Sequence, residues 1–193
     1  MPQFGPIFQV DAATRPAAGE PFALRHALGR HELFARPRLS QLAARMPASD
    51  YFVSYPARNA KTPFYDSLPE GVAAGEVVDG IERGIHKLLL KRPENHDASF
   101  RALLDECLSE AIDLVEVRRR DIIRANSFIF LTGRDAITPL HFDPEYGFFM
   151  QIEGRKTYNL GSPHEVDDDD LERRDRVADA VAELGEINIG IGI

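Results

Sequence analysis

The segment that decides the fold is "ITPLHFDPEYGFFMQIEGRKTYNL", residues 137–160, in which His141 and Asp143 stand two positions apart. In a β-strand, residues two apart project from the same face, so both side chains are expected to point into one space. An imidazole and a carboxylate suit Fe(II), Mn(II) or Zn(II), and with a second histidine they form the facial triad of non-haem iron oxygenases. A lone His-x-Asp triplet is more often a surface or structural feature, so its neighbours decide the interpretation.

An apolar run, "GFFMQIE", comes after the triplet, and Gly154-Arg155 separates it from "KTYNL". This spacing predicts a β-hairpin. Across such a hairpin, Lys156 and Tyr158 would face the same interior as the His-x-Asp pair. A cation there could hold the far carboxylate of an organic diacid whose other end chelates the metal. The alternative is a turn lysine in solvent, which is the common environment of an unpaired lysine.

The clearest helix is predicted over residues 97–115, with Asp97 or Ser99 as its cap. Its apolar residues recur at the spacing of one helix face, which predicts a core element, and Cys107 lies on that face as a buried thiol. A second helix is predicted over residues 32–46, broken near Pro37, and an acidic loop with a helix over 164–184. Strands are predicted at residues 1–10, 50–57, 86–91, 127–133, 138–143 and 187–193.

The length of 193 residues predicts one domain, with a mixed strand and helix region over 1–120 and a β-rich region over 121–193. The single cysteine excludes an internal disulfide and fits a reducing compartment. The first ten residues do not resemble a signal peptide, and no apolar run reaches the length of a membrane span. These features predict a soluble, cytoplasmic protein without a membrane partner.

The net charge of −8 argues against nucleic acid as a partner, because an acidic chain repels phosphates. Two segments are locally basic, one over residues 25–45 and one at "EVRRRDIIR", residues 116–124. We interpret both as solvated helix surfaces with salt bridges, the alternative being a phosphate-binding patch.

The stretch "TPLHFDPEYGFFMQIEGRKTYNLGSP" resembles the JmjC and cupin-like family of Fe(II)/2-oxoglutarate oxygenases. It is similar to the bacterial cupin-like members and to the asparaginyl hydroxylase of hypoxia-inducible factor. The shared pattern is Thr-Pro, one residue, His-x-Asp, an apolar strand with Phe-Phe, then Gln-Ile, Gly and Lys. The specific match covers about 35 residues, and a looser one runs from about residue 30 to 175.

The resemblance implies an α+β protein with a double-stranded β-helix, or jelly roll, and helices packed outside it. Residues 121–193 would then be the first part of the jelly roll. By position, His141 and Asp143 would be the metal ligands and catalytic centre, with Fe(II) and 2-oxoglutarate as cofactors. Thr138 and Lys156 would hold the distal carboxylate of 2-oxoglutarate, and Tyr158 would line its pocket.

Two features depart from the family pattern. Gly147 stands where many members have an asparagine that helps to hold the cosubstrate. The second metal histidine of the family comes several dozen residues after His-x-Asp, whereas here only His164 comes later, in a proline-led acidic loop. His26, His31, His86 and His96 are interpreted as capping, surface or satisfied core residues.

Three explanations of this incomplete barrel stay open. In the first, the chain is part of a longer protein. In the second, a homodimer completes the barrel, either through the open sheet edge or through "EINIGIGI" at the end of the chain. The third is a non-catalytic cupin-like module that binds or regulates. The substrate is not indicated by any motif.

Overall fold

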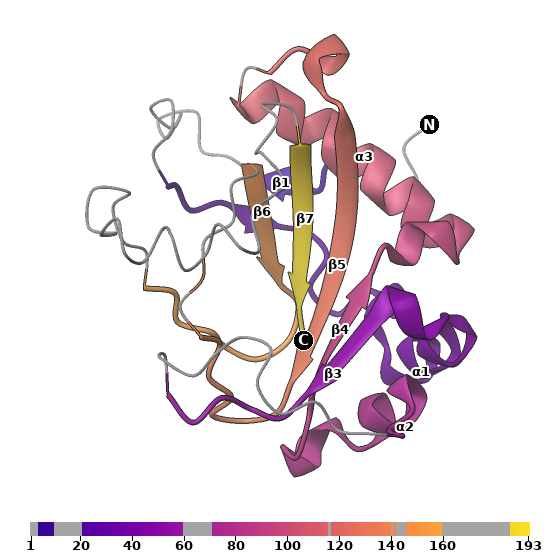
Figure 1. Ribbon diagram of the computed structural model, residues 1–193. Helices are drawn as coiled ribbons and strands as arrows, with labels where there is room; N and C mark the ends of the chain where they lie inside the picture. Colours follow the sequence, from indigo (N-terminus) through magenta and orange to yellow (C-terminus); the bar gives the residue numbers. More distant parts are fainter. Residues whose placement is uncertain are drawn as a thin grey trace, which may run out of the picture.

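The computed structural model describes residues 4–9, 21–59, 71–115, 117–139, 141, 146–159 and 186–193. Its main element is a five-stranded sheet in the order β3-β4-β5-β7-β6 (Figure 1). The strands of this sheet are β3 (Tyr51–Ser54), β4 (Lys87–Lys91), β5 (Arg124–Thr132), β6 (Tyr146–Gln151) and β7 (Glu186–Gly192). A separate ribbon pairs β1 (Phe8–Gln9) with β2 (Arg25–His26).

The sheet is mixed in direction. β4 runs antiparallel to β3 and β5, whereas β7 is parallel to both of its neighbours, β5 and β6. The predicted α+β class is therefore confirmed, whereas the jelly roll, whose sheets are antiparallel, stays a prediction. The described part of the chain contains no closed barrel. Because both edges of β7 are used within the chain, residues 186–192 do not pair with a second copy here, and a homodimer stays a prediction.

The predicted hairpin at Gly154-Arg155 is wrong in its second half. Gly154 does turn the chain, with a φ of +75° that L side chains rarely adopt. Residues 155–159 then continue without strand structure, so they do not pair with β6. The strand predicted at 138–143 is also wrong for its described residues, since only Ile137 makes an isolated bridge, to Ala57.

The helices lie on one face of the sheet (Figure 1). Pro37 falls in the first turn of α1, where a missing N–H costs no helical hydrogen bond, so the helix begins there rather than breaking. The predicted helix over residues 164–184 lies outside the described residues. The α-helices are α1 (Arg36–Arg45), α2 (Ala74–Asp79) and α3 (Ala98–Val115), and the short 3-10 turns are η1 (Glu32–Phe34), η2 (Ala48–Asp50), η3 (Ile81–Arg83), η4 (Pro93–Asn95) and η5 (Arg119–Asp121).

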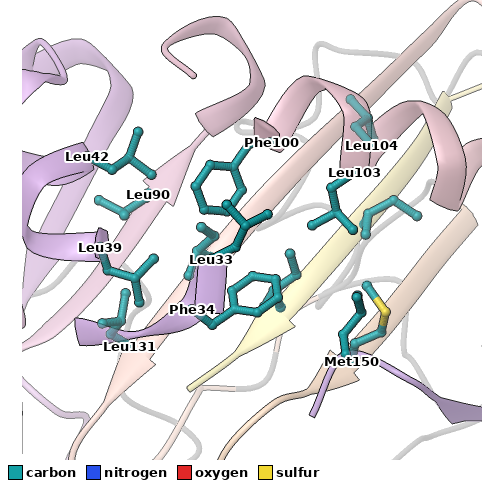
Figure 2. Close-up of a cluster of buried hydrophobic side chains, with 14 of the residues drawn as sticks. Leu33, Phe34, Leu39, Leu42, Leu90, Phe100, Leu103, Leu104, Leu131 and Met150 are labelled. Atoms are coloured by element: carbon teal, nitrogen blue, oxygen red, sulfur yellow. The ribbon is translucent and has the colours of Figure 1, made fainter. Parts of the chain in front are cut away.

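The core lies between α1, α3 and the sheet, where Figure 2 shows aliphatic and aromatic side chains from all three converging. The predicted apolar face of α3 is confirmed, and Asp97 caps the helix by accepting a hydrogen bond from the Ser99 amide at 2.9 Å. Cys107 is fully buried on this face, and burial raises the pKa of its thiol to about 12. It is therefore an inert core residue at neutral pH.

Strand β7, which lies between β5 and β6, has two different faces. Ile189 and Ile191 are buried toward the helices, as the alternation of the sequence predicts. Gly190 and Gly192 occupy the other face, where the ring of Phe149 from β6 lies across them. A Cβ added at Gly190 would come within 2.6 Å of Phe149 Cδ2, so glycine is what permits this close approach.

The two basic segments form ion pairs, as predicted. Arg38 and Arg45 of α1 both contact the Asp97 carboxylate, at 2.5 and 3.2 Å. In the second segment Arg118 contacts Asp121 at 2.5 Å. These contacts support the interpretation as salt-bridged surfaces.

A polar cluster joins η2 to η4 at one end of the sheet. The Asp50 carboxylate contacts His96 Nε2 at 2.7 Å and a guanidinium nitrogen of Arg92 at 2.5 Å. The hydrogen bond from His96, opposed by desolvation and assisted by Arg92, lowers the pKa of Asp50 below its usual value. The ionised carboxylate is therefore favoured in the folded state.

We expect Asp50→Asn to lower the free energy of unfolding by about 1–3 kcal/mol at pH 7, because two donors lose a charged acceptor. A carboxyl whose folded pKa is depressed stabilises above its unfolded pKa, and this contribution fades as the pH falls through the folded pKa. The difference between the proteins should therefore shrink below about pH 4. Urea unfolding from pH 7 to pH 2 measures it, with the exposed Asp105→Asn as control. A difference that does not vary with pH would contradict the expectation.

Candidate functional site

The second face of the sheet, opposite the helices, carries two of the residues predicted for the site, Lys156 and Tyr158. Strand alternation buries Leu88 and Leu90 toward the helices and turns Lys87 of β4 the other way. By the strand register, Phe130 of β5 and Phe149 of β6 share that second face. The side chains of Lys87, Phe130 and Phe149 are only half-buried. The face therefore combines aromatic surface with a cation.

Lys156 returns over this face after the turn at Gly154. Its Nζ lies 5.9 Å from the ring centre of Phe130, 5.4 Å from that of Phe149 and 5.2 Å from that of Tyr158. Burial lowers the pKa of Lys156. The alternative of a turn lysine in solvent is therefore wrong, because the side chain is half-buried against three rings. Rings around an ammonium stabilise its charge through their electron-rich faces.

Tyr158 lies beside Lys156 as the sequence predicts, but not through a hairpin. Its ring packs against that of Phe149 with 4.9 Å between ring centres, while 45% of the residue stays exposed. Burial raises the pKa of its phenol, so the hydroxyl stays protonated and can donate a hydrogen bond.

Lys87 is the residue that sequence reasoning missed. Its Nζ donates to the Ile137 carbonyl at 3.3 Å. Burial first, and then the positive charge of Lys156, lowers the pKa of Lys87, so the two ammonium groups lie within range of each other's charge. The available signal was the alternation "KLLLK", which turns Lys87 away from its buried leucine neighbours.

Thr138 comes directly after the carbonyl that holds Lys87, and its side chain is half-buried. The structure thus brings the segment of Thr138 to Lys87, and Lys87 to the vicinity of Lys156. These residues come from β4, from the segment after β5 and from the segment after β6.

His141 is exposed, and its Nδ1 lies 2.8 Å from the Pro139 carbonyl. A carbonyl can only accept, so Nδ1 carries a proton, and in the neutral form of the ring the lone pair is on Nε2. Metal-ligating histidines are commonly fixed in this way. Asp143 lies outside the described residues. Within the described residues no group of three or more His, Cys, Asp and Glu side chains could hold a metal ion.

The histidines interpreted as structural have local partners. His31 accepts from the Leu33 amide and so caps η1, and His96 contacts Asp50. His26 Nε2 lies 3.1 Å from the Gln151 carbonyl, and the His86 ring packs against Tyr55. His164 is outside the described residues.

Comparison of the chain with family models, curated proteins and solved structures found no match. Among the helices of the described residues, none has the length and apolar character to cross a membrane. Two half-buried ammonium groups beside aromatic rings can hold an anion that carries a carbon chain.

Proposed function

We propose that this chain is a 2-oxoglutarate- and Fe(II)-dependent oxygenase of the JmjC and cupin-like type, and that Lys156 binds the distal carboxylate of the cosubstrate. The observation that carries the proposal is the half-buried ammonium of Lys156 above Phe130, Phe149 and Tyr158. The double-stranded β-helix belongs to the same proposal.

A carboxylate would offset the desolvation of Lys156. Burial disfavours the charged form of a lysine, and a nearby anion favours it. The carboxylate of the ligand would supply a counter-charge to the half-buried ammonium. The rings of Phe130 and Phe149 would pack against the methylene groups of the acid, and the Thr138 and Tyr158 hydroxyls would donate to its oxygens.

For the metal, the described residues fit only in part. The tautomer of His141 suits coordination through Nε2, and Asp143 is assigned as the second ligand by the sequence pattern alone. Bound Fe(II) would supply the activation of dioxygen and the oxidative decarboxylation of the cosubstrate. The contribution of the protein would be to position the diacid with Lys156 and to hold its carbon chain against the aromatic rings.

Anaerobic calorimetry with Fe(II) and 2-oxoglutarate tests the binding site. We expect Lys156→Met to weaken 2-oxoglutarate binding by about 100-fold, because it leaves a desolvated carboxylate without its cation. Lys91→Met is the matched control, since Lys91 shares the strand and face of Lys87 but lies at the far end of β4. Equal affinity of wild type and Lys156→Met, or no binding by wild type, overturns the proposal.

The metal is tested by the visible charge-transfer absorption of an Fe(II)–2-oxoglutarate complex. This absorption should appear in wild type and be lost in His141→Ala. If 2-oxoglutarate binds but no absorption appears, the chain is the non-catalytic binding module instead.

A further inference from the structure

We infer that Lys87 is a second binding residue of this anion site, so that the distal carboxylate of the ligand lies between one lysine from β4 and one from the segment after β6. The inference rests on the proposed function and adds a specificity-determining residue to it. It predicts that the site selects organic diacids over monoacids of the same chain length.

Lys87 lies on the same face of the sheet as the Phe130 ring. Lys87 pairs with Thr132 in the strand register, and the next pair on the same face is Leu89 with Phe130. Diagonal neighbours on one sheet face lie within reach of long side chains. Because the Lys156 ammonium lies over the Phe130 ring, both lysines reach toward the same part of the face.

The ammonium groups of Lys87 and Lys156 also interact through their charges. Two ammonium groups that are both half-buried repel each other more strongly than they would in water. Burial first, and then the positive charge of Lys156, lowers the pKa of Lys87. An anion between the two groups would turn this repulsion into two attractions, and a carboxylate has two oxygens to accept from two donors.

A hydrogen bond to the backbone positions the Lys87 ammonium. The Lys87 ammonium is held beside Thr138 by its hydrogen bond to the Ile137 carbonyl at 3.3 Å. A lysine fixed in this way loses less side-chain entropy when the ligand binds. Lys91 offers the contrast, because it pairs with Phe128 and lies roughly 13 Å further along the strand at about 3.3 Å per residue.

The test is calorimetry on the Fe(II)-loaded full chain, with 2-oxoglutarate and with 2-oxopentanoate, which has the same carbon chain but lacks the distal carboxylate. Lys87→Met should weaken 2-oxoglutarate binding by about 10- to 100-fold. It should leave 2-oxopentanoate binding within about 2-fold, a pattern that a general structural defect would not give. Lys91→Met should bind both acids like wild type, and Lys87→Arg should retain most of the affinity for the diacid.

The outcomes separate the two claims. If Lys156→Met loses 2-oxoglutarate while Lys87→Met keeps wild-type affinity, Lys87 is not a binding residue and the proposed function stands. Equal weakening of diacid and monoacid by Lys87→Met also overturns the inference, since it indicates loss of structure. If wild type binds neither acid, the proposed function itself fails. Lys87→Gln with circular dichroism serves if Lys87→Met does not fold.

Discussion

Replacing Phe100 by alanine should lower the free energy of unfolding by about 3–5 kcal/mol. Phe100 lies on α3 with 1% of its surface exposed, and its ring meets that of Phe34 edge-on with 6.0 Å between ring centres. The substitution removes a large apolar side chain from the layer that joins helices and sheet (Figure 2), and the surrounding groups can close the cavity only in part. Urea unfolding followed by circular dichroism measures the loss.

Ile123→Ala is the control for this experiment. Ile123 is 59% exposed, so its truncation should change the stability by less than about 0.5 kcal/mol. A loss below about 1 kcal/mol for Phe100→Ala would contradict the packing of α3 on the sheet.

The second large effect is expected for Gly190→Val, which should lower the free energy of unfolding by about 1–3 kcal/mol and weaken 2-oxoglutarate binding as well. The new side chain meets the Phe149 ring, whose Cδ2 would lie 2.6 Å from the added Cβ. Phe149 cannot stay where it is, and it is one of the three rings that surround the Lys156 ammonium. Unfolding curves and calorimetry on the same protein measure both effects.

Gly147→Val separates crowding from the general effect of replacing a strand glycine. Gly147 also lies on the second face, but a Cβ there meets no atom within 4 Å. We expect a change in stability of no more than about 0.5 kcal/mol. If both glycine variants behave alike, Phe149 does not lie across β7 as described.

Local patterns in the sequence predicted the elements whose apolar residues recur at the period of a helix or of a strand. The stripe that includes Phe100 and Leu104 predicted α3, and the alternation of Ile189 and Ile191 predicted β7 with its buried face. The neighbours of β7 were not predictable, because pairing with β5 and β6 depends on residues distant in the sequence. The mixed direction of the sheet could not be predicted for the same reason.

The hairpin prediction failed because a turn signal determines the turn itself but not the path of the chain beyond it. Gly154 makes the turn. Beyond it, Lys156 and Tyr158 pack against aromatic rings on the sheet face instead of pairing with β6. Lys156 and Tyr158 therefore lie side by side on the sheet face, whereas their sharing of one interior with His141 and Asp143 stays a prediction.

Lys87 was missed because strand alternation tells only which residues share a face. "KLLLK" shows that Lys87 lies opposite its buried leucine neighbours, but the register with β5 decides that this face is the one beneath Lys156. Its place near Lys156 and Thr138 depends on three segments that are distant in the sequence.

The strand order predicts which strands open together. Since β6 is joined to the sheet only through β7, the described strands β3, β4 and β5 can assemble with the helices before β6 is attached. A partly folded molecule in which β7 is unpaired would have its helical layer, but the Phe149 ring would not be packed across β7. Hydrogen exchange should accordingly show β6 and β7 opening together, as one cooperative unit less protected than β4 and β5.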